Sequence, residues 1–329
     1  MLTFYDQFGR KDLPWQLNKT AYSVWVSEIM LQQTQVKTVI PYYLKFMNRF
    51  ENVESLAKAD IDEVLIFWAG LGYYSRARNL HACAKQIVED FKGEFPKNLE
   101  QVVSLPGIGE STGGAILSLA YGLPEAILDG NVKRVLARVF LVDGWYGNSK
   151  VGKELWEISR KYTPTVRTGD FNQAMMDLGA GICNRSKPQC DNCPLNKHCE
   201  ANLQNKTVEY PHRKPKKLIP TKYATMLLSL KNSKVLLHKR PPSGIWGGLW
   251  SFPELEQEKA ANLTVSGKFK HTFSHYHLQA TVVSENTNDL NLHKALQAED
   301  NNQLAWHNVN ELNKLALPTP IKKYLLNNL

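Results

Sequence analysis

Four of the five cysteines in this 329-residue chain lie between positions 183 and 199, and this crowding is its strongest constraint. They are Cys183, Cys190, Cys193 and Cys199. The N-terminal residues do not form the basic and then apolar pattern of an export signal, and an odd number of cysteines is a poor disulfide framework. We therefore expect a cytoplasmic protein whose cysteine loop holds a metal or a cluster.

The spacing in this loop bears on which group it binds. Four thiolates in one short loop can wrap a compact iron–sulfur cluster. Zinc is the alternative, but zinc ribbons usually present two Cys-x2-Cys pairs, and this loop contains one. The spacing favours a 4Fe–4S cluster on Cys183, Cys190, Cys193 and Cys199. The remaining Cys83 lies in a predicted helix and is expected in the core.

Length and composition indicate a globular protein with two domains. Hydrophobic residues make up 43% and charged residues 22%, which is typical of globular chains. No apolar run approaches the roughly 18 residues of a membrane span, so no membrane partner is expected. The formal net charge of +9 is compatible with a nucleic-acid partner.

The hydrophobic pattern changes after the cysteine loop. Residues 1–205 are predicted to form a helical domain, 206–221 a basic linker, and 222–329 a smaller α+β domain. In the first domain, a helix from Tyr22 is expected to break at Pro41. Expected N-cap residues of further helices are Asp60, Asn98, Asp129 and Asp170. Expected strands lie within 223–230, 234–240, 249–254, 269–283 and 303–309, with a helix at 321–326.

A glycine-rich segment, LPGIGESTGGAI at 105–116, precedes a predicted helix. Gly107 and Gly109 would let the backbone approach a phosphate, and a helix N-terminus offers free amide donors. A dinucleotide-binding fingerprint would need a small residue at Thr112 and a preceding strand, and neither is found. A plain glycine turn is the other alternative. Beside a cysteine loop and a basic chain, a DNA-binding helix–hairpin–helix is favoured.

Two carboxylates stand out, each with two interpretations. Glu28 lies in a strongly apolar predicted helix, where it is either a paired core residue or a functional acid. Asp129 precedes another helix, where it is either an N-cap or a functional carboxylate.

Together these motifs resemble the endonuclease-III-like DNA glycosylases and, within them, the adenine DNA glycosylases (the MutY family). The narrower resemblance rests on LPWQ (13–16), SEIMLQQTQV (27–36), GLGYYSRARNL (70–80), ILDGNVKRV (127–135), NQAMMDLGAGIC (172–183) and HTFSHYHL (271–278). It spans nearly the whole chain. The fold it implies is a mainly α helix–hairpin–helix glycosylase domain with a 4Fe–4S loop, followed by an α+β Nudix-like domain.

The resemblance implies a DNA repair glycosylase that hydrolyses the N-glycosidic bond of adenine opposite 8-oxoguanine or guanine in duplex DNA. Glu28 would protonate the base, and Asp129 would stay ionised beneath the sugar cation. Gly107, Gly109 and Ser111 would contact the DNA backbone. Because Ser111 stands where bifunctional relatives carry the lyase lysine, the enzyme would be monofunctional. It would act as a monomer.

The resemblance also assigns the residues that contact the two bases. Those expected to line the adenine pocket are Trp15, Gln16, Leu31 and Gln173. Those expected near the gap left by the flipped base are Gln33, Thr34 and Tyr73. Those expected to read 8-oxoguanine are Phe273, Ser274 and His275.

Three other functions are compatible with parts of the sequence. A non-catalytic iron–sulfur lesion sensor would keep the cysteine loop and the hairpin without needing Glu28. A pyrimidine-lesion glycosylase would share the superfamily. A Nudix pyrophosphatase would need the metal box that Gly248 and Glu254 only begin, because the later acidic positions are missing.

Overall fold

The computed structural model describes residues 1–215, 218–261, 263–284 and 303–329. The described chain divides into two compact units, Met1–Lys58 with Asn79–Lys216, and Ala59–Arg78 with Lys217–Leu329. The sequence did not indicate that residues 59–78 would group with the C-terminal part, and the boundaries at 205 and 222 stay a prediction. Lys216 and Lys217 of the expected linker lie outside the described residues.

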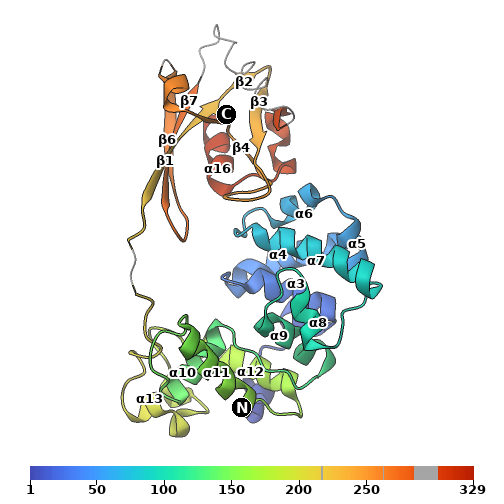
Figure 1. The fold of residues 1–329 in the computed structure, drawn as a ribbon, viewed down its shortest axis with the longest axis vertical. Helices are drawn as coiled ribbons and strands as arrows, with labels where there is room; N and C mark the ends of the chain where they lie inside the picture. Colours follow the sequence, from blue (N-terminus) through green and yellow to red (C-terminus); the bar gives the residue numbers. More distant parts are fainter. Residues whose placement is uncertain (216–217, 262, 285–302) are drawn as a thin grey trace. The chain divides into compact units, whose positions relative to one another are not determined.

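The first unit is built from helices, as expected (Figure 1). Their bounds are α1 (Leu2–Phe8), α2 (Pro14–Leu17), α3 (Ala21–Leu31), α4 (Val36–Arg49), α5 (Val53–Lys58), α7 (Ser75–Phe91, mostly in this unit), α8 (Leu99–Ser104), α9 (Glu110–Tyr121), α10 (Gly130–Val139), α11 (Ser149–Tyr162), α12 (Thr168–Gly181) and α13 (Glu200–Leu203). Two short 3-10 turns, Cys190–Asn192 and Asn196–His198, shape the cysteine loop. No described helix is long and apolar enough to cross a membrane.

Helix α3 forms the centre of this unit. The Thr20 hydroxyl accepts from the Ser23 amide, and the Ser23 hydroxyl accepts from the Thr20 amide, so a capping box starts the helix. Nearly every side chain of α3 is buried, and the helix packs against α4 and α9. A carboxylate on this helix is therefore carried into an apolar environment.

The structure corrects two local predictions. Pro41 does not break the helix, because α4 continues through it, and the break comes earlier at Gln33, whose φ is 60°. Only the helical turn N-terminal to the proline loses a hydrogen bond. Asp170 is not an N-cap, because α12 begins at Thr168 after Arg167 and Asp170 lies in its first turn. The caps at Asp60, Asn98 and Asp129 are confirmed.

The glycine segment forms the expected hairpin between α8 and α9. Gly107 has a φ of 77°, a left-handed value that favours glycine, and Gly109 is the N-cap of α9. Gly114 has no room for a side chain, since an added Cβ would lie 2.2 Å from the Ala126 carbonyl oxygen. The hairpin helix is thereby held against the segment that leads to Asp129.

The second unit holds α6 (Ile61–Trp68) and the expected C-terminal α+β fold. Its remaining elements are β1 (Thr221–Leu228), β2 (Leu230–Lys231), β3 (Lys234–Lys239), β4 (Trp250–Ser251), β5 (Glu254–Leu255), α14 (Gln257–Ala260), β6 (Thr264–Thr272), β7 (His277–Ser284), β8 (Leu304–Asn308), a 3-10 helix (Val309–Lys314) and α16 (Thr319–Asn328).

Two small sheets organise these strands. One has the order β5-β1-β7-β6, with β1 and β7 parallel, and the other has the order β2-β3-β4, with β8 pairing β3. Helix α16 packs against β6 of the first sheet. Its Tyr324 ring contacts Phe269 of β6 and Phe252, which follows β4. Figure 1 shows the helix beside the strands. The hairpin β6–β7 carries the predicted reading loop at its turn.

Candidate active site

Of the two predicted catalytic carboxylates, Asp129 influences the ionisation of Glu28. Glu28 follows the buried Ser27 and precedes the buried Ile29 on α3. Burial raises the pKa of Glu28 to about 8, and the negative charge of Asp129 acts in the same direction. At neutral pH, Glu28 therefore keeps the proton that a general acid needs.

Asp129 lies in a more polar environment than Glu28. As the N-cap of α10, it accepts hydrogen bonds from the amides of Asn131 (3.0 Å) and Val132 (2.8 Å) and from the Asn131 side chain (3.0 Å). Burial raises the pKa of Asp129, whereas these hydrogen bonds and the Arg134 charge oppose the rise. The structure thus confirms Asp129 as an N-cap whose charge also raises the pKa of Glu28, and its role as a functional carboxylate stays a prediction.

Arg134 connects Asp129 to the start of the cysteine loop. Its Nη2 donates to Asn131 Oδ1 at 2.9 Å, and its Nε donates to the Cys183 carbonyl at 2.7 Å. Gly179 permits the close approach of α12 to α10, because an added Cβ would lie 2.5 Å from Asn131 Cβ. The loop and the candidate catalytic carboxylate therefore share one hydrogen-bonded framework.

Ser111 lies in the first turn of α9, beside the same segment. Its hydroxyl oxygen accepts a hydrogen bond from the Leu128 amide at 2.9 Å, one residue before Asp129. Gly107 and Gly109 lie in the hairpin that leads into this turn. The hairpin and Asp129 are thus joined locally, and the predicted contacts with DNA phosphates remain predictions.

Two of the predicted pocket residues meet directly. Gln16 Nε2 donates to Gln173 Oε1 at 2.5 Å, which joins α2 to α12. Trp15 is buried, and its ring packs edge-on against Tyr43 with 5.3 Å between centroids. Leu31, the last residue of α3, is partly exposed.

The predicted gap-filling residues share an unusual backbone. Gln33 and Tyr73 have φ values of 60° and 49°, a left-handed conformation that is costly for residues with side chains. Both side chains are exposed, Tyr73 by 47%. Thr34 is partly exposed, and its amide donates to the Leu31 carbonyl. Strained, exposed side chains of this kind are common where a protein must present a group to a ligand.

Arg76 holds the loop around Tyr73. The guanidinium lies over the Tyr73 ring and the Trp68 ring, at 5.7 Å and 5.3 Å from their centroids. Its Nη2 donates to the carbonyls of Leu71 and Gly72. Burial lowers the pKa of Arg76 to about 10, which still leaves it charged at neutral pH.

The predicted reading loop is a tight turn supported by aromatic rings. Phe273 packs against Trp246, His271 and Tyr276, with centroids 5.5, 4.6 and 4.9 Å away. Ser274 and His275 are exposed at the tip, and Ser274 Oγ lies 3.4 Å from His275 Nδ1. The polar groups expected to read a base are therefore presented by an apolar platform.

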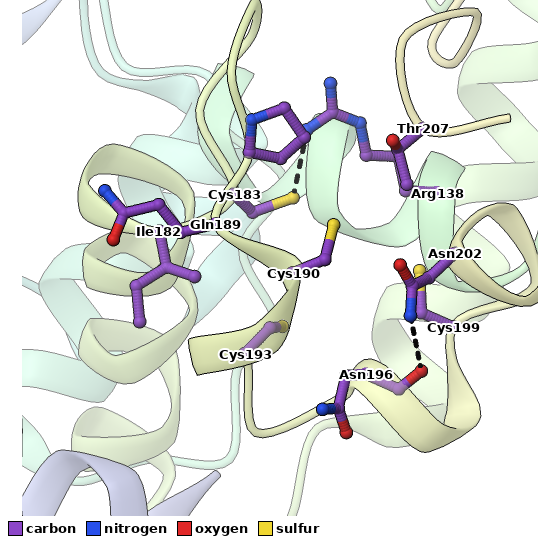
Figure 2. Close-up of a pocket in the computed structure, with 11 residues that line it drawn as sticks. Arg138, Ile182, Cys183, Gln189, Cys190, Cys193, Asn196, Cys199, Asn202 and Thr207 are labelled. Carbon is purple, nitrogen blue, oxygen red and sulfur yellow. Dashed lines mark hydrogen bonds between the residues drawn. The ribbon is translucent and has the colours of Figure 1, made fainter. Parts of the chain in front are cut away.

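The four clustered cysteines line one cavity, together with Arg138 (Figure 2). Arg138 is buried, and its Nη1 donates to Cys183 Sγ at 3.3 Å, a contact drawn in Figure 2. Its other donors bind the carbonyls of Asn184, Arg185 and Tyr210. Within the described part of the chain, no three side chains already stand at metal-binding geometry.

The chemistry of this donor set fits a cationic metal centre. Burial raises the pKa of Cys193 to about 11 and also raises those of Cys190 and Cys199. Converging thiols of this kind, of which Cys199 is buried and the other three are partly exposed, become thiolates when a metal ion balances their charge. The buried guanidinium of Arg138 would further stabilise a cluster whose thiolates give it net negative charge. Cys83 is buried elsewhere, as expected.

Sequence reasoning missed several residues that organise these sites. Asp177 and Arg10 support the Gln16–Gln173 pair, Arg138 supports the cysteine loop, and Trp246 supports the reading loop. Asp177 and Arg138 are nearly inaccessible charged residues. A charged residue on the apolar face of its predicted helix was the one signal available in the sequence.

Comparison with known proteins finds a matching family for the helical region and another for the C-terminal region. Residues 26–161 match the HhH-GPD superfamily of base excision DNA repair proteins, and residues 224–327 match the NUDIX domain. An adenine DNA glycosylase of Buchnera aphidicola subsp. Baizongia pistaciae is 42% identical over 99% of this chain and 94% of its own length. The human adenine DNA glycosylase is 34% identical over 84% of this chain and 64% of its own length.

Solved structures support the fold of the helical part. A thermostable thymine-DNA glycosylase is 32% identical, with a TM-score of 0.56 over 62% of this chain and 93% of that one. A non-covalent endonuclease III–DNA complex is 19% identical, with a TM-score of 0.52 over 62% of this chain and 92% of that one. The helix–hairpin–helix glycosylase fold expected from the sequence is confirmed, as is the C-terminal Nudix fold.

Proposed function

This chain belongs to the adenine DNA glycosylase family, and we propose that it removes adenine that is mispaired with 8-oxoguanine or guanine in duplex DNA. It is a base excision repair glycosylase, which acts by cleaving an N-glycosyl bond. The identity of the base opposite the adenine is the part that we propose. One observation carries the chemistry: Glu28, a partly exposed acid between buried neighbours on α3, has a pKa that desolvation raises to about 8, and a second carboxylate, Asp129, adds to the rise.

The two carboxylates suit acid-catalysed depurination. Adenine leaves poorly as an anion, and protonation of its imidazole ring by Glu28 makes it a neutral leaving group. The sugar then carries oxocarbenium character, which a carboxylate that stays ionised stabilises. The backbone donors of α10 favour that ionised form at Asp129. Water completes the hydrolysis, and Ser111, which has no amine, forms no Schiff base.

The target base must leave the helical stack before Glu28 can reach it. Gln33 and Tyr73, which are exposed on left-handed backbone, would fill the resulting gap with Thr34 close by. Trp15, Gln16, Leu31 and Gln173 would line the adenine pocket. The hairpin at Gly107 and Gly109 would bind phosphates through backbone amides.

The β6–β7 turn would read the partner base. Ser274 and His275 offer polar groups at its tip, and Phe273 offers an aromatic face. 8-Oxoguanine differs from guanine by a carbonyl at C8 and a hydrogen on N7. A hydroxyl such as that of Ser274 can bond to either group. Replacing Ser274 with Ala should therefore reduce activity on adenine opposite 8-oxoguanine more than opposite guanine.

We also propose that Cys183, Cys190, Cys193 and Cys199 hold a 4Fe–4S cluster. Such a cluster would cross-link the loop that carries Arg185, Lys187 and Lys197. Visible absorption and iron analysis of the purified chain test this assignment. Four iron atoms per chain support it, and one zinc without iron overturns it.

The decisive assay follows base release from duplexes that carry one central adenine opposite 8-oxoguanine, guanine or thymine, and from a duplex that carries one oxidised pyrimidine. The intact chain is compared with Glu28→Gln and with Glu89→Gln, a control on an exposed position of α7. We expect release opposite 8-oxoguanine and guanine, abolished in Glu28→Gln and retained in Glu89→Gln. Release of oxidised pyrimidines without adenine would instead identify a pyrimidine-lesion enzyme. Mispair binding without any release by the intact chain would identify a lesion sensor.

A further inference from the structure

We propose that Asp177, held by Arg10, is a positioning residue that orients the amides of Gln173 and Gln16 so that the pocket accepts a 6-aminopurine and rejects a 6-oxopurine. The inference rests on the proposed adenine pocket and deepens it. Neither Asp177 nor Arg10 is expected to touch the base. Their influence passes through a chain of hydrogen bonds whose direction is fixed at one end.

The fixed end is an ion pair. Asp177 on α12 is 6% exposed. Arg10 Nε and Nη2 donate to its Oδ1 at 2.8 and 2.7 Å, and the Arg10 amide donates to its Oδ2 at 2.9 Å. Since three donors of Arg10 already point at its two oxygens, this carboxylate group acts as an acceptor in its further hydrogen bonds.

This property dictates the orientation of both glutamines. Gln173 must present its NH2 group to Asp177, and its Nε2 lies 2.8 Å from Asp177 Oδ1. The Gln173 carbonyl oxygen is then left to accept from Gln16 Nε2. Reversing either amide alone would bring two donors or two acceptors together. The Asp177 carboxylate therefore determines which way the Gln16 amide is turned, although the two side chains are linked only through Gln173.

This series of hydrogen bonds ends at an acceptor without a partner in the described part of the chain, the side-chain oxygen of Gln16. Gln16 Oε1 is buried and has no hydrogen-bond partner among the described residues. A buried acceptor without a partner is costly, and a ligand that supplies a donor recovers the loss. The exocyclic amine of adenine is such a donor, whereas the 6-oxo group of hypoxanthine or guanine would face Gln16 Oε1 as a second acceptor.

The test compares single-turnover base release from duplexes that carry adenine, hypoxanthine or unsubstituted purine opposite the same 8-oxoguanine. The Asp177→Asn variant carries an amide that can donate or accept, so the direction of the hydrogen bonds through Gln173 and Gln16 is no longer fixed. We expect the adenine-to-hypoxanthine rate ratio to fall by about tenfold or more, in line with the loss of one buried hydrogen bond. Asp177→Glu keeps an acceptor and should restore most of the ratio. Intrinsic differences between the glycosidic bonds cancel when each variant is compared with the intact chain.

Asp170→Asn is the matched control, because Asp170 lies on the same helix and is also paired with an arginine, Arg167. It should leave the ratio unchanged. Gln16→Met removes the acceptor itself and should lower the adenine-to-purine ratio even if Asp177→Asn does not fold. Equal slowing of all three bases in both Asp177→Asn and Gln16→Met would overturn the inference alone. No adenine release by the intact chain would overturn the proposed function together with it.

Discussion

Replacing Glu28 with Gln should stabilise the protein at neutral and alkaline pH while it abolishes base release. The amide is close in shape to the protonated acid and carries no titratable proton. Ionisation of Glu28 is favourable in the unfolded chain above its ordinary pKa of 4.5, but in the folded chain only above about 8. Between these values the folded state binds the additional proton, so stability falls as pH rises.

The magnitude follows from this difference. pH 7 lies 2.5 units above the unfolded-state pKa of 4.5. At roughly 1.4 kcal/mol per unit, Glu28 therefore lowers the free energy of unfolding by about 3 kcal/mol at this pH. The cost should vanish below pH 4.5 and level off above pH 8, where it approaches about 5 kcal/mol. Because burial raises the pKa of Asp129 as well, the slope from that group has the same sign.

Thermal unfolding of the intact chain and of Glu28→Gln at pH 5, 7 and 9 measures the effect. We expect the Tm advantage of the variant to grow with pH, by about 2–4 °C for each kcal/mol. Glu89→Gln should show no such trend. A Tm difference that is constant with pH, or a destabilised variant at pH 9, would refute the argument that desolvation governs Glu28.

Two further predictions concern the hairpin and the cysteine loop. Gly114→Ala should destabilise the fold by roughly 1–3 kcal/mol, because its Cβ would collide with the Ala126 carbonyl. Gly152→Ala on α11, where the added Cβ would lie an ordinary 3.6 Å from its nearest neighbour, should not, and equal Tm values for the two variants would contradict the steric argument. Charge reversal in the cysteine loop should weaken binding to matched and mispaired duplexes alike and flatten the salt dependence of log K by about one for each phosphate that the loop no longer binds. The residues to reverse are Arg185, Lys187 and Lys197. If only binding to the mispaired duplex fell, the loop would contact bases rather than phosphates.

Local chemistry explains what the sequence predicted well. Side-chain caps such as Asn98 and Asp129 act within a few residues, and the glycines of the hairpin are required by backbone conformation and close packing. The caps and the backbone conformation of Gly107 can be recognised without knowing the tertiary structure. The alternating strands of the C-terminal region were recognisable for the same reason.

The features that the sequence did not predict depend on how the chain folds back on itself. The break at Gln33 replaces the one expected at Pro41, since α4 continues through the proline, whereas the left-handed residue after α3 redirects the chain. Asp177 and Gln173 are close in sequence, but their partners Arg10 and Gln16 lie more than 150 residues away. No local pattern reports pairings of that range.

The left-handed backbone at Gln33 and Tyr73 has a consequence for natural and laboratory evolution. Glycine would adopt either conformation without the penalty of about 1 kcal/mol that a side chain incurs. A population screened only for thermal tolerance should therefore drift toward Gln33→Gly, and less toward Tyr73→Gly because that change also loses the contact between the ring and Arg76, whereas one screened for low mutation frequency should retain the bulky residues. Divergence between the two populations at these positions would reveal how much robustness the enzyme gives up for its activity.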